Sequence, residues 1–125
     1  MLKTIQTENA LRPAGHYSQG IIHNDVLYVS GQFSIHPDTG EKVFGTAAEE
    51  AAQILVNLEG ILEAAGTSID RVIKVVVYVA DIGYWDEVNA VYSAAFDDHK
   101  PVRTVVPTNE LHFGFKVEMD FIAAV

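Results

Sequence analysis

Apolar and polar residues alternate in short runs through the first third of the chain, which is typical of antiparallel strands. We expect strands over residues 4–7, 20–23 and 26–30. An Asn-Asp pair between the last two runs tolerates the positive φ of a tight hairpin turn. A Pro-Asp-Thr-Gly sequence at 37–40 predicts a second turn, because proline presets φ and glycine takes the left-handed position. Together the turns predict an antiparallel meander.

The spacing of apolar residues then changes to that of a helix. Thr46 and Glu49 form a capping box, and apolar residues recur every three or four positions until Gly66, which ends the predicted helix. A second helical stripe follows and ends near Phe96, since Pro101 prevents the helix from continuing.

Residues 72–79 are rich in β-branched side chains and interrupted only by Lys74, which predicts a central strand buried on most of both faces. Two further strands are expected over 103–106 and 115–124, and Pro107 marks an edge or a bulge. The order β-β-β-α-β-α-β-β predicts an α+β fold, with two helices on one face of a mixed sheet. We expect the other face to be apolar as well, and such a sheet usually associates.

The net charge disfavours nucleic acid as a partner. The 125 residues, which we expect to form a single domain (1–125), carry 17 acidic and eight basic side chains, a formal charge of −9. Affinity for nucleic acids depends mainly on Lys and Arg that displace counterions. No basic stripe is present, so we expect no nucleic-acid binding.

Several other kinds of chemistry are also disfavoured. The absence of cysteine excludes disulfides and thiolate sites, and the five histidines lack metal-ligand spacing. No glycine-rich phosphate loop occurs, so we expect neither a metal nor a cofactor. No apolar run is long enough to span a bilayer, and the polar N-terminal segment does not read as a signal peptide. We therefore expect a cytoplasmic protein without membrane attachment.

Arg103 and Glu118 are the charged residues that stand out. Arg103 opens an apolar strand, where it either pairs with a surface carboxylate or grips a substrate carboxylate with two hydrogen bonds. Glu118 lies in a strictly alternating strand, where it belongs either to a solvated face or to a site that relays protons through a bound water.

Three other residues have ordinary structural interpretations. Tyr17 lies in a glycine-flanked loop and reads as a packed aromatic, while Ser30 at a strand end reads as satisfying local backbone groups. Asn89 interrupts the second helical stripe, which favours a tertiary hydrogen bond over a catalytic task.

Taken together, several segments resemble the RidA/YjgF family of enamine/imine deaminases over essentially the full chain. Each segment is weak alone, but their order and spacing are specific. The matching segments are Thr-Glu-Asn-Ala at 7–10, Gly-His-Tyr-Ser-Gln-Gly at 15–20, Ser-Gly-Gln at 30–32, Pro-Asp-Thr-Gly-Glu at 37–41, Glu-Ala-Ala-Gly at 63–66, Lys-Val-Val-Val-Tyr-Val-Ala-Asp at 74–81, Val-Asn-Ala-Val-Tyr at 88–92, Pro-Val-Arg at 101–103 and Val-Glu-Met-Asp at 117–120.

The resemblance implies a chorismate-mutase-like fold, a six-stranded sheet, and a homotrimer with active sites in clefts between subunits. It implies a hydrolase that converts 2-aminoacrylate-type enamines and 2-imino acids, such as 2-iminobutanoate and 2-iminopropanoate, to 2-keto acids and ammonia without a cofactor. The family's residues map onto catalytic and substrate-binding positions here. Arg103 would hold the substrate carboxylate, Glu118 the attacking water, and Tyr17 would reach in from the neighbouring subunit, while the Val105 backbone, Ser30, Gly31 and Asn89 would contact the ligand or line the cleft.

The chain also departs from the family pattern. His16 replaces a proline before Tyr17, Pro107 is additional, and His112 stands in an unusual loop over residues 109–114. His16 and His112 either approach the cleft and alter side-chain preference or are surface loop residues. The altered loop leaves open a pathway-specific deaminase of a larger enamine. A non-catalytic trimer whose clefts bind keto acids or other metabolites is a separate alternative.

Overall fold

Six strands form one mixed sheet in the computed structural model, which describes residues 1–125. The strand order is β1-β2-β3-β6-β4-β5; β4 and β5 run parallel, and all other neighbours are antiparallel. The strands are β1 (Lys3–Ile5), β2 (Gly20–His23), β3 (Val26–Gln32), β4 (Val72–Val79), β5 (Val102–Pro107) and β6 (Val117–Ala124).

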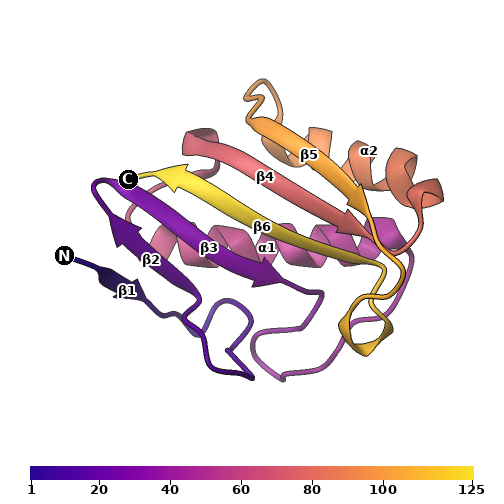
Figure 1. The fold of residues 1–125 in the computed structure, drawn as a ribbon, viewed down its shortest axis with the longest axis horizontal. Helices are drawn as coiled ribbons and strands as arrows, with labels where there is room; N and C mark the ends of the chain where they lie inside the picture. Colours follow the sequence, from indigo (N-terminus) through magenta and orange to yellow (C-terminus); the bar gives the residue numbers. More distant parts are fainter.

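Two α-helices, α1 (Ala47–Ala64) and α2 (Trp85–Phe96), cover one face of the sheet and leave the other face open (Figure 1). Three short 3-10 helices, η1 (Ile69–Arg71), η2 (Ile82–Tyr84) and η3 (His112–Gly114), lie in the connections. The predicted α+β class, element order and one-sided helix layer are confirmed. No helix has the length and apolar composition needed to cross a membrane.

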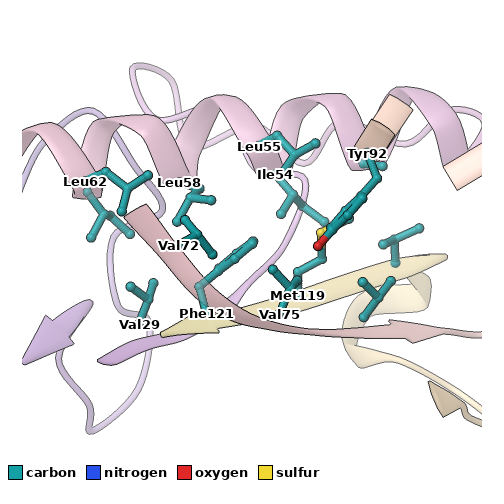
Figure 2. Close-up of a cluster of buried hydrophobic side chains, with 14 of the residues drawn as sticks. Val29, Ile54, Leu55, Leu58, Leu62, Val72, Val75, Tyr92, Met119 and Phe121 are labelled. Atoms are coloured by element: carbon teal, nitrogen blue, oxygen red, sulfur yellow. The ribbon is translucent and has the colours of Figure 1, made fainter. Parts of the chain in front are cut away.

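The core lies between α1 and the sheet. Leu58 and Leu62 of α1 point down onto the sheet residues Val29 and Phe121, as Figure 2 shows. The predicted capping box at Thr46 and the predicted glycine stop are both present, which fixes the ends of α1. Alternation along β6 sends Val117, Met119, Phe121 and Ala123 into this core.

Several predicted bounds are wrong, for local physical reasons. The first strand ends at Ile5 rather than residue 7, because the Thr7 amide donates to the Gln19 side chain (2.7 Å) instead of a strand. The turn at 37–40 forms, with Gly40 at φ 72°, but it joins a single bridge between Ile35 and Lys42 and no further strand pair. The strand predicted from 103 spans Val102–Pro107.

The prediction that β4 is buried on most of both faces is also wrong within one chain. Val75, Val77 and Val79 are buried under the helices, but on the open face Lys74 is exposed and Ile73 keeps 44% of its surface. The open face combines apolar residues with the acidic residues of β6 rather than being uniformly apolar.

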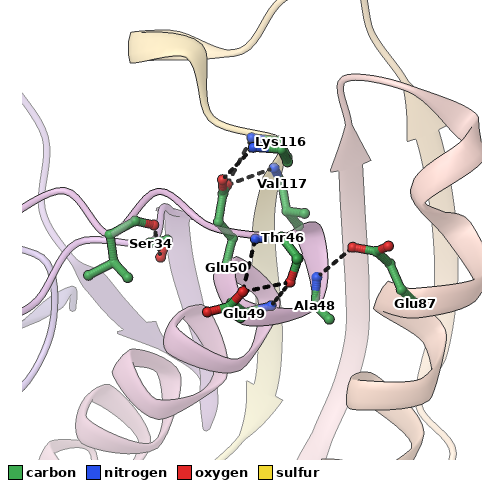
Figure 3. A network of polar contacts seen from close by, with 9 residues as sticks. Ser34, Thr46, Ala48, Glu49, Glu50, Glu87, Lys116 and Val117 are labelled. Atoms are coloured by element: carbon green, nitrogen blue, oxygen red, sulfur yellow. Dashed lines mark hydrogen bonds and ion pairs between the residues drawn. The ribbon is translucent and has the colours of Figure 1, made fainter.

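A buried carboxylate fixes the start of β6 (Figure 3). Glu50 of α1 is fully buried, and its Oε1 accepts from the amides of Lys116 (2.8 Å) and Val117 (3.3 Å). Its Oε2 has no hydrogen-bond partner and lies 3.8 Å from the Lys116 ammonium. Because Glu50 takes these amides, β6 begins at Val117 rather than at the predicted residue 115.

Burial raises the pKa of the Glu50 carboxyl above its ordinary value of 4.5, although the amides of Lys116 and Val117 and the Lys116 charge oppose the shift. A carboxyl whose pKa is higher in the folded state binds protons more tightly there than in the unfolded chain. Stability therefore falls as the pH rises above 4.5 and Glu50 ionises.

We expect Glu50→Gln to raise the free energy of unfolding near pH 7, because glutamine keeps the acceptor oxygen and removes the buried charge. The gain over wild type should shrink as the pH falls below 4.5, where Glu50 is protonated in both states. Urea unfolding at several pH values measures it. Glu50→Leu is the matched control and should be destabilised at every pH, since it leaves two amides unpaired. A gain independent of pH would contradict this account.

Gly60 allows α1 to approach the N-terminal segment. A Cβ at this position would lie 2.9 Å from the Asn9 Cβ and 3.0 Å from its carbonyl carbon. Alanine normally stabilises a helix interior by about 1 kcal/mol relative to glycine. We expect Gly60→Ala to have the opposite sign and destabilise by roughly 1–3 kcal/mol, because the added methyl overlaps the Asn9 backbone. Thermal unfolding measures it, with the exposed neighbour Glu59→Ala as a near-neutral control.

Candidate functional site

Three connecting segments gather at the end of the sheet where β3 ends and β6 begins (Figure 1). Between them lies a pocket of about 400 Å³, here called the Glu118 pocket. The predicted site residues Tyr17, Ser30, Gly31 and Glu118 all line it. The structure thus brings together four side chains or backbone positions from the N-terminal loop, β3 and β6.

A bulge in β3 shapes the polar end of this pocket. Val29 pairs with Phe121 and Gln32 with Met119, so the register shifts across Ser30 and Gly31. A Cβ on Gly31 would overlap the Glu118 carboxylate, which explains a glycine inside a strand. Bulges of this kind often redirect side chains next to active sites.

Ser30 fastens the loop that carries Tyr17. Its hydroxyl donates to the Ser18 carbonyl (2.6 Å), and its amide donates to the Gln19 carbonyl (2.9 Å). The predicted local role of a strand-end serine is therefore confirmed. Tyr17 itself keeps 44% of its surface exposed, which leaves the ring accessible from solvent.

The surroundings of Glu118 raise the pKa of its carboxyl. Burial raises the pKa of its carboxyl above 4.5, and the negative charge of Asp120 raises it further. Asp120 lies two residues along β6 and accepts a hydrogen bond from the Tyr78 hydroxyl (3.1 Å). A carboxyl whose pKa is shifted toward neutrality exchanges protons more readily near physiological pH.

The rest of the Glu118 pocket is largely apolar. Its wall is made by Leu11, Ala14, Phe33, Ile35, His112 and Phe113, with Gly15 in the N-terminal loop. Of the two histidines that depart from the family pattern, His112 lines the pocket, whereas His16 is exposed and does not.

Arg103 lies in a separate niche beneath α2. Its Nη1 donates to the Asn89 side-chain oxygen (2.8 Å), and its guanidinium carbon lies 4.7 Å from the Tyr92 ring centre and 5.6 Å from that of Trp85. Val105 shares a small crevice with these residues. The tertiary hydrogen bond predicted for Asn89 is confirmed.

Arg103 has no carboxylate partner in the chain. The two ion pairs present are Arg12–Glu8 and Lys116–Glu50. Of the two interpretations of Arg103, pairing with a surface carboxylate is therefore wrong within one chain. Burial raises the pKa of Tyr92 to about 12, partly offset by the Arg103 charge, so this ring remains a neutral face for the guanidinium.

Arg103 and Glu118 do not meet within one chain. Arg103 pairs with Val75 and Val105 with Val77, so both side chains lie on the helix-covered face. Glu118 pairs with Tyr78 and belongs to the open face. Because successive side chains in a strand point to opposite faces, no rotation of either side chain brings the two groups into one pocket.

The sequence analysis did not identify the aromatic residues around Arg103 or those of the Glu118 pocket. Trp85 and Tyr92 flank Arg103, and Phe33 and Phe113 form the wall of the Glu118 pocket. The helical spacing of Tyr92 indicated only a core position. No group of three or more His, Asp or Glu side chains converges as metal ligands would.

Comparison with known proteins agrees with this architecture. A family model described as endoribonuclease L-PSP matches residues 7–125. A curated relative from Escherichia coli K12, 2-iminobutanoate/2-iminopropanoate deaminase, is 39% identical over 126 aligned positions, which cover 98% of each chain.

Two solved structures share the fold. A Yersinia pestis protein described as a protein of unknown function of the conserved Rid family superposes with a TM-score of 0.97 at 36% identity, with full coverage of both chains. The Escherichia coli protein TdcF, solved with bound serine, superposes with a TM-score of 0.93 at 32% identity and 98% coverage of both chains. With a family model that spans residues 7–125 and relatives that align over the whole chain, this protein belongs to the RidA/YjgF (endoribonuclease L-PSP) family.

Proposed function

We propose that this protein hydrolyses 2-imino acids, and the enamines that tautomerise to them, to 2-keto acids and ammonia. The observation that carries the proposal is the Arg103 guanidinium, held by Asn89 between two aromatic rings and left without a carboxylate partner. The identity of the Escherichia coli relative as a 2-iminobutanoate/2-iminopropanoate deaminase supports the same chemistry.

Arg103 anchors the substrate in this proposal. Its planar guanidinium offers parallel N–H donors that match a carboxylate, and the hydrogen bond to Asn89 restricts its orientation. Every 2-imino acid carries a carboxylate next to the reacting carbon. Holding that group therefore fixes the carbon at which water must add.

Glu118 serves as the proton relay. The substrate reacts as the protonated imine. As carboxylate, Glu118 accepts a proton from the water whose oxygen adds to the imine carbon, which gives a neutral carbinolamine. The carboxyl then returns that proton to the nitrogen. The hydroxyl oxygen forms the carbonyl as the C–N bond breaks, and its proton leaves with the ammonia as ammonium, beside the 2-keto acid. The raised pKa of Glu118 suits both steps, because the group must gain and lose a proton in turn.

A second copy of the chain is needed to complete this site. Arg103 and Glu118 lie on opposite faces of one sheet, so we infer that the Arg103 niche of one copy faces the Glu118 pocket of its neighbour. Tyr17, Ser30 and Glu118 then come from the same copy, because they line one pocket. A cyclic homotrimer, as the family resemblance implies, gives three such sites.

Purely non-catalytic binding and RNA cleavage are the competing functions. A binding protein needs Arg103 equally but has no use for a proton relay at Glu118. Cleavage of RNA needs an attractive surface for phosphates, and a chain with formal charge −9 repels them. The deaminase relative from Escherichia coli, together with the raised pKa of Glu118, favours hydrolysis of a small carboxylate-bearing substrate.

We expect Arg103→Ala to lower kcat/KM by about 100-fold, because charged hydrogen bonds contribute roughly 1.5–3 kcal/mol each. An amino-acid oxidase generates 2-iminopropanoate or 2-iminobutanoate in place, and semicarbazide traps the imine that survives. Arg71→Ala, an exposed arginine outside both places, is the matched control and should behave as wild type. Wild-type protein that leaves trapping unchanged would overturn the deaminase proposal.

The shared site has its own test. Co-expressed Arg103→Ala and Glu118→Gln chains should regain activity in mixed assemblies, where about a quarter of the sites combine an intact arginine with an intact glutamate from different copies. Each variant alone should stay far below the activity of the mixed assemblies. Mixed assemblies that show no recovery, or a monomeric mass in solution for the active wild type, would refute a site built from two copies.

The pH profile should follow Glu118. The carboxylate is the form that accepts a proton from water, so kcat/KM should fall as the pH drops, with its midpoint at the pKa of Glu118. Asp120→Asn should move that midpoint to lower pH, because it removes the negative charge that helps to raise the pKa of Glu118. Stopped assays across buffers of constant ionic strength measure it. If Asp120→Asn does not change the midpoint of the fall in kcat/KM at low pH, the proton relay is a group other than Glu118.

A further inference from the structure

The Glu118 pocket has two ends of different chemistry. Glu118, Ser30 and Gly31 form a polar end, whereas Phe33 and Phe113 belong to the apolar wall. Its volume of about 400 Å³ falls within the range of roughly 300–1,000 Å³ typical of sites for drug-sized ligands. A substrate with only a methyl or ethyl side chain would leave the apolar end without a contact.

The aromatic wall is fixed before any ligand arrives. Phe115 is 1% exposed and stacks on the wall residue Phe33 with ring centres 5.1 Å apart. Phe113 meets Phe115 edge-on at 6.2 Å. A preformed wall loses little side-chain entropy on binding, so an apolar ligand group gains most of its contact energy.

Phe113 adopts a strained backbone conformation. Its φ of 60° and ψ of 10° lie in the left-handed region, which costs of order 1–3 kcal/mol for a side chain other than glycine. The ring nevertheless keeps 49% of its surface exposed, so it returns less stability than a buried ring would.

Two neighbours hold the Phe113 ring in place. The centre of the His112 ring lies 3.7 Å from that of the Phe113 ring. The ammonium of Lys42, which belongs to another segment, lies 4.5 Å from the centre of the Phe113 ring. Such strain, sustained by surrounding contacts, concentrates at ligand sites. The ring is therefore presented to the pocket rather than buried in the core.

From these contacts we propose that the apolar end of the Glu118 pocket selects 2-imino acids with a large apolar or aromatic side chain over those with a methyl or ethyl group. The inference rests on the proposed deaminase function, since it takes Glu118 as the reacting end. The carboxylate lies toward Arg103 of the neighbouring copy, the imine carbon lies beside Glu118, and the side chain extends to Phe33 and Phe113.

The test compares two imines made by the same oxidase, from phenylalanine and from alanine. Wild type should show kcat/KM at least about tenfold higher for the phenylalanine imine, since apolar contacts of this size discriminate by roughly 10–200-fold. Phe113→Asn should lose most of that preference, because kcat/KM should fall far more for the phenylalanine imine than for the alanine imine. Asparagine tolerates the left-handed backbone, so the loop keeps its shape without the ring.

Phe44→Asn is the matched control. Phe44 is also an exposed ring stacked on Phe115, but it does not line the pocket, so the preference should survive. Equal kcat/KM for the two imines in wild type would overturn the inference and leave the deaminase function standing. The inference would also be overturned if Phe113→Asn kept the preference for the phenylalanine imine.

Failure of the deaminase function itself has a different signature, because then neither imine is consumed. The pocket is in that case tested by calorimetry with the keto acids phenylpyruvate and pyruvate. Tighter binding of phenylpyruvate that Phe113→Asn abolishes would support the selective pocket without catalysis. Equal affinity for the two keto acids would overturn it.

Discussion

The register of β6 is the constraint on which the other features depend. This strand lies between β3 and β4 and is antiparallel to both, so one alternation serves two purposes. Met119 and Phe121 complete the core under α1, while Glu118 is placed on the open face. A slip of one residue would bury the carboxylate and expose the core residues. Glu50 opposes that slip, since it holds the first amides of the strand from within α1.

The periodicity of the chain was sufficient to predict the fold class, the element order and the layer arrangement. Capping signals at Thr46 and Gly66 even fixed the ends of α1. The wrong bounds of the first and last strands share one cause, namely side chains that capture backbone amides from a distant segment. Gln19 does so at Thr7 and Glu50 does so at Lys116, and neither pairing leaves a trace in local sequence.

The candidate site was predictable only in part. The residue types at Arg103 and Glu118 already suggested an anion anchor and a proton relay, and the family resemblance named their companions. Local sequence does not indicate that Arg103 and Glu118 lie on opposite faces of the sheet in one chain. Their placement follows from the registers of β5 and β6 against β4. The aromatic surroundings of Arg103 and the strained Phe113 depend on tertiary contacts, which a local pattern does not encode.

The placement of the Arg103 niche and the Glu118 pocket on opposite faces of one sheet has an evolutionary consequence. Within one chain, substitutions in the niche and in the loop around Phe113 share no direct contact, so their effects on the free energy of unfolding should combine almost additively. Natural variation is then free to remodel the pocket while the guanidinium and its amide partner stay unchanged. A lineage could thus change its substrate preference without passing through variants that no longer bind the substrate carboxylate.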